Sequence, residues 1–187
     1  MSQEGKGCMA RLPQGYTITR ADPEEVDELV AVNLASDTLF ADTGLIDPAD
    51  LGHHIPKQVF ADAIADRDVF VARYGKAEMP VGFTLTSERD GTLYLDQISV
   101  HPDHGQKGLG RALMKRVLED ARDRGFRMVT LSTFKDVAWN GPFYKKLGFR
   151  PIASEKLSDW MREIETAQAE TLDVTKRHFM KKRVRLF

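Results

Sequence analysis

The sequence predicts a single α/β domain, of the α+β kind, built on a mixed sheet. Three strand-like runs separated by short turns occupy residues 69–100, and amphipathic helical runs lie before and after them. A glycine-rich turn then leads into another helix, a strand and a helix. With 187 residues, the chain is long enough for one domain with its own core and too short for two ordinary ones.

The composition argues against two classes of partner. Apolar residues make up 42% of the chain and charged residues 29%, as in an average soluble protein, and no apolar run is long enough for a bilayer span. We therefore expect no membrane interaction. The formal net charge of −1 gives no basic field for a phosphate backbone, so nucleic acid is not an expected partner.

The N-terminal residues lack the long apolar run of a signal peptide. We expect residues 1–15 to be flexible and the protein to be cytoplasmic. Cys8 is the only cysteine, which excludes an intrachain disulfide and a thiolate metal site. Because the sequence also has no HExxH or paired CxxC pattern, we expect no metal.

The folded part is expected to begin with a short strand at residues 16–20. Asp22 followed by Pro23 is typical of a helix start. The apolar residues of this helix repeat at three and four positions and share one face: Val26, Leu29, Val30 and Leu34. We expect the helix to fray near residues 36–40.

A second helix is expected from Pro48 to Asp66, with Pro56 as a point where it can break. Strands then follow at residues 69–74, 81–88 and 92–100, separated by turn residues. This spacing predicts an antiparallel meander.

The C-terminal part continues with a helix from Arg111 to Arg124, closed by Gly125. A strand at residues 128–134 and a helix ending in KKLGF follow. An acidic amphipathic helix at residues 157–169 and the basic strand-like run RHFMKKRVRL complete the chain. We treat residues 16–187 as one domain with a C-terminal helix and strand.

The run ISVHPDHGQKGLGRAL carries the clearest functional signal. A strand leads into a glycine-rich turn that opens a helix, so backbone N–H groups and the helix dipole converge on one anion-binding spot. Gly108 and Gly110 lack Cβ atoms and let a pyrophosphate approach the main chain. Gln106, Lys107 and Arg111 can add side-chain contacts. Two glycines alone are also compatible with an ordinary turn between strand and helix.

This region resembles the GNAT superfamily of acetyl-CoA-dependent N-acetyltransferases. The family signature, Gln/Arg-x-x-Gly-x-Gly/Ala, is similar to GQKGLG after ISVHP, and WNGPFYKKLGF resembles the family's Asn…Tyr-x-x-Leu-Gly-Phe segment. One departure is Gly105, which stands where the family has Gln or Arg. The resemblance implies a mostly antiparallel central sheet with helices on both faces, and acetyl-CoA as co-substrate.

The resemblance also implies how acetyl-CoA is held. The main chain of Ile98, Ser99 and Val100 pairs with the pantetheine like an added strand, with the Val100 N–H near the acetyl carbonyl. The turn from Gln106 through Leu109 to Arg111 holds the pyrophosphate, largely by its main chain.

Tyr144 matches the family's general acid, which protonates the departing CoA thiolate. Its alternative role is that of a core aromatic residue. Asn140, one turn earlier, is a candidate cofactor contact, and alternatively it only helps to start the helix. Family members more often place the asparagine at the position of Val137.

Asp96 is the candidate general base. Strand alternation predicts that it shares a face with Tyr94, Ile98 and Val100, where partial burial would raise its pKa. Alternatively, it is a solvated or salt-bridged residue of the cleft wall. The family's frequent glutamate on the next strand has no counterpart in LSTF, so proton removal through water stays open.

Other polar side chains offer weaker candidates. His53 and His54 are expected on the second helix, which often lines the acceptor pocket in this family, or simply on the surface. A basic cluster can meet the CoA 3′-phosphate or an acidic partner, or can protect an edge strand: Lys181, Lys182, Arg183 and Arg185.

Together these features predict an enzyme that moves the acetyl group of acetyl-CoA directly to a primary amine, which we expect to belong to a small molecule. Acetylation of a protein N-terminus or lysine is the alternative, and a non-catalytic CoA-binding module is a third. A homodimer is compatible with the sequence.

Overall fold

In the computed structural model of the protein, residues 12–185 are described except residues 48, 51 and 53. Cys8 and His53 therefore lie outside the described residues, as does most of the segment predicted to be flexible. No helix in the described part is long and apolar enough to cross a membrane.

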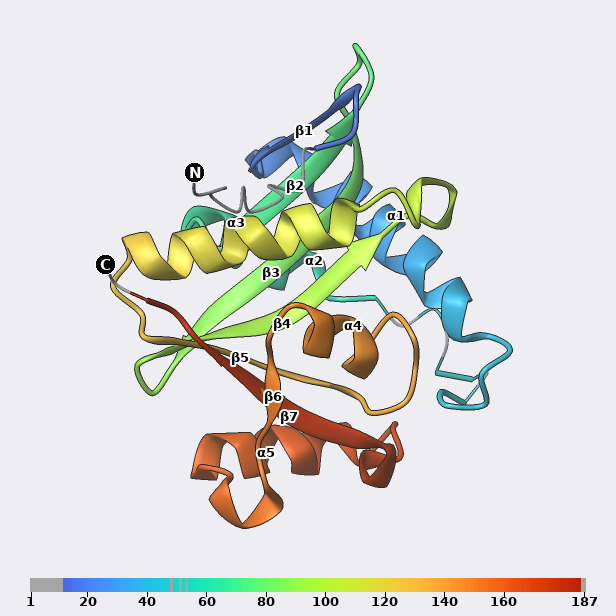
Figure 1. Ribbon diagram of the computed structural model, residues 1–187. Coiled ribbons are helices and arrows are strands. Elements are labelled where there is room, and N and C mark those ends of the chain that lie inside the picture. The colour runs from blue at the N-terminus through green and yellow to red at the C-terminus, as the bar shows by residue number, and fades with distance from the viewer. Residues whose placement is uncertain (1–11, 48, 51, 53, 186–187) are drawn as a thin grey trace, which may run out of the picture.

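The described strands form one sheet in the order β1-β2-β3-β4-β5-β7-β6, shown in Figure 1. Only β4 and β5 run parallel in it, and the other neighbours are antiparallel, which confirms the predicted mixed sheet. The strands are β1 (Tyr16–Arg20), β2 (Val69–Tyr74), β3 (Met79–Arg89), β4 (Thr92–Val100), β5 (Met128–Phe134), β6 (Arg150–Pro151) and β7 (Arg177–Arg183).

The meander predicted before the glycine turn is correct. β3 and β4 are joined by Asp90 and Gly91, whose φ angles of 48° and 71° give the left-handed two-residue turn that suits a tight hairpin. Glycine tolerates this conformation without strain and aspartate better than most residues do. The observed bounds of β2, β3 and β4 agree with the predicted strands at residues 69–74, 81–88 and 92–100 to within a few residues.

Helices cover both faces of the sheet, as the resemblance implied. They are α1 (Val26–Asp37), α2 (Lys57–Ala65), α3 (Leu109–Asp123), α4 (Gly141–Lys146) and α5 (Asp159–Gln168). On one face, α3 buries Leu113 and Val117 against Leu93 of β4. On the other, α1 and α2 bury Leu29 and Phe60.

A third cluster attaches α5 to the C-terminal part of the sheet, at the bottom of Figure 1. Its buried residues are Tyr94, Ile152, Met161 and Phe179. The C-terminal helix and strand were predicted, and β7 enters the sheet between β5 and β6.

The second helix is shorter than predicted. It begins at Lys57 because Pro56, with φ −55° and ψ 140°, is extended and has no N–H to continue a helix on its N-terminal side. His54 precedes the helix and is exposed, so its predicted place on the helix is wrong. The segment before it instead reaches across the molecule, where Ile46 forms a β-bridge with Leu172.

The basic cluster at the chain end does not lie near the glycine turn. Arg183 pairs with Met128 at the start of β5. The glycine turn follows the end of β4, and β4 and β5 are parallel, so the cluster and the turn lie at opposite ends of the sheet. Contact with the CoA 3′-phosphate at that turn is therefore not available to Lys181, Lys182 or Arg183.

Candidate active site

The sheet opens between β4 and β5. These strands pair only at Leu93↔Val129, Tyr94↔Thr130 and Leu95↔Leu131, although both continue beyond that point. Figure 1 shows them diverging, with α4 lying in front of the gap. The edge of β4 that faces β5 therefore has no strand partner from Asp96 to Val100. Unpaired backbone groups at such an edge can pair with an extended ligand.

A β-bulge at Asp96 accompanies this opening. Leu85 pairs with Gln97 and Thr86 pairs with Leu95, which leaves Asp96 as the extra residue of β4. A bulge bends a strand and re-aims its side chains.

The bulge also overturns the predicted alternation. Ile98 and Val100 pack against the core under α3, whereas Tyr94 packs against α5. Asp96 therefore does not share one face with all three residues. Past the bulge, Gln97 and Ser99 point the same way, and the Gln97 amide donates to the Ser99 hydroxyl at 3.0 Å.

The glycine turn after β4 presents free donors. Gln106 and Gly108 have left-handed φ angles of 57° and 85°, and Gly108 is the N-cap of α3. None of the backbone N–H groups from Gln106 to Arg111 has an acceptor among the described residues. Successive free N–H groups at a helix N-terminus form an anion-binding nest.

The departure at Gly105 has a structural cause. A Cβ atom there would lie only 3.0 Å from the carbonyl oxygen of Pro102. The turn is too tight for the Gln or Arg of the family signature without a local shift. The side chains of Gln106 and Lys107 are exposed beside the nest, and the Lys107 ammonium donates to the Asp103 carbonyl at 2.8 Å.

Helix α4 is held close to both the nest and β5. A Cβ atom at Gly141 would lie 2.3 Å from the Lys135 carbonyl oxygen, so only glycine allows this approach to the end of β5. At the other side, Gly110 faces Phe143 with 3.6 Å between a built Cβ and the ring. These contacts fix the position of Tyr144.

Tyr144 is buried between Phe143 and Phe149, with ring centroids 5.1 and 5.7 Å away. Its hydroxyl has no hydrogen-bond partner among the described residues. The hydroxyl oxygen is nevertheless not fully enclosed by the protein. Burial raises the pKa of Tyr144, and the charge of Arg177 opposes this rise. The hydroxyl is therefore a protonated donor that solvent or a ligand can reach.

Asn140 is the N-cap of α4 rather than part of its first turn. Its carbonyl oxygen accepts the Tyr144 N–H at 3.0 Å. Its side-chain amide makes no capping bond, so that amide is available to a ligand.

Asp96 has the protonation behaviour expected of a base. Burial raises its pKa to about 6, while the Ser87 hydroxyl and the charge of Arg89 oppose this rise. Its Oδ2 atom is enclosed without a hydrogen-bond partner. A carboxylate with such a pKa is ionised at neutral pH and accepts a proton more readily than an ordinary aspartate.

Sequence reasoning missed a second carboxylate, Asp37, at the end of α1. Burial raises its pKa to about 6. The neighbouring Ser36 joins this helix end to β4 through a 3.0 Å hydrogen bond to Ser99. Nothing in the local sequence distinguishes Asp37, because its burial depends on how α1 meets the sheet.

Aromatic rings and loops from separate segments meet on the α1 side of the gap. Phe40, which follows α1, lies 5.7 Å from Phe134 at the end of β5 and 5.9 Å from Trp139 before α4, measured between ring centroids. The bridge between Ile46 and Leu172 joins the loop after α1 to the loop before β7.

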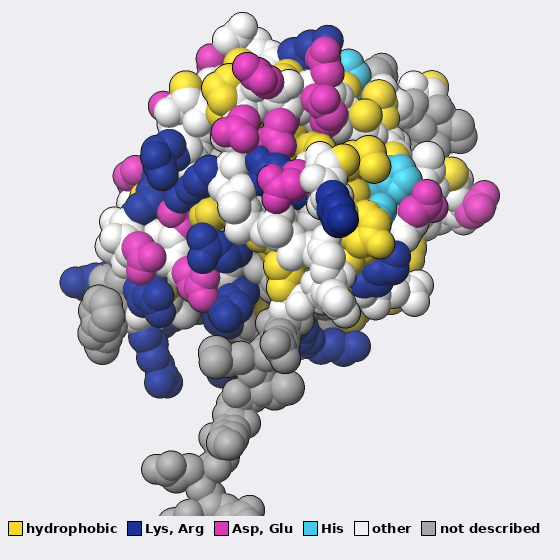
Figure 2. Space-filling model, turned by 90° about the horizontal axis from the view of Figure 1, so that it is seen from above, with side chains coloured by type: hydrophobic (Ala, Val, Ile, Leu, Met, Phe, Trp, Pro, Cys, Tyr) yellow, Lys and Arg dark blue, Asp and Glu magenta, His cyan; other side chains and the backbone are white. Residues whose placement is uncertain are grey.

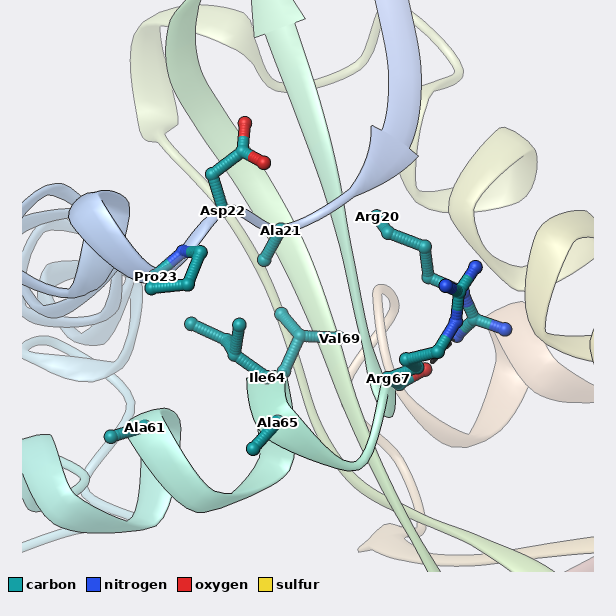
Figure 3. A pocket seen from close by; sticks show the side chains of 9 residues that line it. All are labelled: Arg20, Ala21, Asp22, Pro23, Ala61, Ile64, Ala65, Arg67 and Val69. Carbon is teal, nitrogen blue, oxygen red and sulfur yellow. Dashed lines mark hydrogen bonds between the residues drawn. The ribbon is translucent and has the colours of Figure 1, made fainter.

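A cavity lies away from this gap. It has a volume of about 410 Å³, and Figure 3 shows apolar side chains of β2 and α2 facing it, with Arg20 and Arg67 together at one side. None of its lining residues belongs to β4, β5 or α4. The molecular face seen from above carries acidic side chains among basic ones (Figure 2).

Comparison with known proteins identifies the arrangement. The model of the acetyltransferase (GNAT) family matches residues 39–149, which is more than half of the chain. The chain belongs to the GNAT acetyltransferase family. Within the described residues of this GNAT protein, no group of three His, Cys, Asp or Glu side chains could hold a metal ion.

The similar proteins are acetyltransferases with different names. The chain is 27% identical to a mycothiol acetyltransferase from Propionibacterium freudenreichii, over 78% of this chain and 46% of that protein. It spans less than half the length of the curated relatives it matches.

Solved structures share the fold, and two of them serve as examples. The ribosomal-protein-S18-alanine N-acetyltransferase from Escherichia coli has a TM-score of 0.64 and 16% identity, covering 90% of this chain and 94% of its own. The PaiA N-acetyltransferase from Thermoplasma acidophilum, in complex with coenzyme A, has a TM-score of 0.69 and 15% identity, covering 91% and 99%.

Proposed function

We propose that the protein transfers the acetyl group of acetyl-CoA directly to the primary amine of a small molecule. One observation carries this proposal. An unpaired β-strand edge, from Asp96 to Val100, leads directly into the nest of free N–H groups from Gln106 to Arg111. A strand edge followed by an anion site matches the extended pantetheine and the pyrophosphate of CoA.

Acetyl-CoA lies in the gap between β4 and β5. The main chain of Ile98, Ser99 and Val100 pairs with the pantetheine, and the Val100 N–H stabilises the developing oxyanion of the acetyl group. The nest binds the pyrophosphate, with Lys107 and Arg111 adding charge. The free amide of Asn140 contacts the cofactor from the α4 side.

The proton transfers follow from the two titrating groups. Asp96 accepts a proton from the incoming ammonium, directly or through water, and the neutral amine attacks the acetyl carbonyl. The tetrahedral intermediate then collapses, the C–S bond breaks, and the Tyr144 hydroxyl donates its proton to the leaving thiolate. The nitrogen of the new amide releases its extra proton to water, and water returns a proton to the Tyr144 oxygen. The raised pKa of Tyr144 keeps its hydroxyl protonated until the thiolate forms.

The enclosure of the site favours a small acceptor. Phe40 meets Phe134 and Trp139 beside the gap, and the Ile46–Leu172 bridge spans the loops on that side. A protein N-terminus would need an open groove with main-chain partners, which this bridge restricts. A non-catalytic CoA module would have no use for the reachable Tyr144 hydroxyl.

The test is a thiol-release assay with acetyl-CoA and a panel of primary amines, run beside thermal unfolding with and without acetyl-CoA. We expect acetyl-CoA to raise the melting temperature and at least one small amine to stimulate CoA release. A stable, acetyl-CoA-binding protein that responds only to peptide amines would replace the small-molecule acceptor with the protein alternative.

A further inference from the structure

Arg177, the first residue of β7, carries a charge that the proposed reaction does not use. Its guanidinium lies over the ring of Phe134, 4.6 Å from the centroid. The Nε atom donates to the side-chain oxygen of Gln168 at 3.2 Å, and Nη2 donates to the carbonyl oxygen of Ser132 at 3.1 Å. All of these partners are neutral.

No carboxylate of the described residues lies within 4.0 Å of the Arg177 guanidinium. Burial lowers the pKa of Arg177, and the groups that oppose this are the hydroxyls of Tyr94 and Tyr144 rather than an acid. Arg73 is the contrasting case, because its guanidinium donates twice to the Glu25 carboxylate at 2.6 Å. A desolvated charge without a counterion is costly.

One nitrogen of the Arg177 guanidinium is left without a hydrogen-bond partner in the described part of the chain. This nitrogen, Nη1, has no acceptor among the described residues, and the protein does not fully enclose it. Solvent or a ligand can therefore reach it. Glu165 lines the same small hollow but forms no ion pair with it.

The position of Arg177 is beside the reaction centre. It pairs with Phe134 across the β5–β7 ladder, and Phe134 meets Phe40 on the acceptor side of the gap. Its charge acts on both Tyr94 and Tyr144, and Tyr94 also senses the charge of Asp96. Tyr94 is therefore within electrostatic reach of both the Arg177 cation and the Asp96 carboxyl group.

We propose that Arg177 binds a carboxylate of the acceptor, which makes the acceptor an amino acid or another amine that carries a carboxylate. The ammonium of such a molecule lies toward Asp96, while its carboxylate takes the Nη1 side of the guanidinium. An arginine suits this task because its planar donors match a carboxylate. This inference rests on the proposed function and names the substrate class of the same site.

The test compares matched acceptors with wild type, Arg177→Met and Arg177→Lys. Each α-, β- or γ-amino acid in the panel is paired with its uncharged amide, and kcat/KM is measured for both. A charge-assisted contact predicts a preference of about 10- to 100-fold for the acid in the wild type. Arg177→Met should bring this ratio to about one, and Arg177→Lys should keep part of it because lysine retains the charge without the fork.

A purely structural role gives a different pattern, because it would lower kcat/KM for acids and amides together and leave the ratio unchanged. Arg183→Met, on the same strand and exposed, is the matched control and should keep the wild-type ratio. If Arg177→Met does not fold, Arg177→Lys takes its place in the kcat/KM comparison of acids with amides. Product inhibition of the wild type then gives a second acid-to-amide ratio, from the inhibition constants of N-acetyl amino acids and of their amides.

The outcomes separate the two proposals. A wild-type ratio near one, or a ratio that Arg177→Met leaves unchanged, contradicts the carboxylate site while amine acetylation stands. An absence of turnover with every amine contradicts the proposed function and the inference together. A preference for acids that disappears in Arg177→Met supports both.

Discussion

The Asp96 carboxyl lies at the bulge of β4, where burial raises its pKa to about 6. The bulge could not be read from the sequence, since it depends on the register between β3 and β4. Simple alternation therefore placed Ile98 and Val100 on the wrong face relative to Tyr94. The chemical nature of Asp96 was readable, but its surroundings were not.

We predict an acidic limb near pH 6 in the kcat/KM profile. Activity rises with pH through this region because the base form of Asp96 is the carboxylate, which predominates above its pKa. In Asp96→Asn this limb disappears and the residual rate is low. A variant that keeps both the limb and the rate would assign the base to another group, such as Asp37.

The same carboxyl should lower stability at neutral pH. Its pKa rises from 3.8 to about 6 on folding, so the native state binds more protons between these values, and the free energy of unfolding falls as pH rises through that window. Asp96→Asn should therefore be more stable than wild type by about 1–3 kcal/mol at pH 8 and nearly equal at pH 4. Urea unfolding at both pH values measures this, and a difference that is independent of pH would contradict it.

Tyr144→Phe keeps the ring and its packing but removes the proposed proton donor. General acid catalysis contributes roughly 10²- to 10⁴-fold, and water replaces part of it, so kcat should fall by about 10- to 10³-fold. Acetyl-CoA affinity should change little. Tyr74→Phe, at an exposed tyrosine, is the control. Wild-type turnover in Tyr144→Phe would return this residue to a packing role.

At the level of elements, the strands were predictable because alternation and turn residues are local signals. The second helix was predicted too long. Pro56 is extended, and the Ile55 N–H donates to the Asn33 side chain of α1 at 3.0 Å, a contact that local sequence does not reveal. Arg177 and Asp37 were missed for a related reason. Their burial is produced by packing between elements that are far apart in sequence.

Gly141→Ala tests how α4 is positioned. The new methyl group would meet the backbone oxygens of Lys135 and Phe134 at 2.3 and 2.9 Å, so α4 must move away from β5. We expect a loss of about 1–3 kcal/mol of stability from overpacking and a fall in kcat as Tyr144 shifts. In Gly110→Ala the nearest atom is 3.6 Å away, which makes it the control for thermal stability. Equal melting temperatures in the two variants would contradict this view of α4.

At the scale of the whole molecule, two parts of the sheet meet at a short parallel junction. The part from β1 to β4 carries α1, α2 and α3, and the part from β5 to β7 carries α4 and α5 (Figure 1). They pair at three positions and then separate. The gap, the nest and the two titrating groups all lie where the parts diverge, so the topology assembles the site.

The central claim is that this gap and its nest bind acetyl-CoA, and calorimetric titration of acetyl-CoA into wild type and Gly108→Glu tests it most directly. Gly108 has a φ of 85° and opens the nest, so glutamate there adds strain and a negative charge where the pyrophosphate binds. The account predicts saturable binding to the wild type and none to a folded Gly108→Glu protein. Unchanged affinity in that folded variant would contradict it.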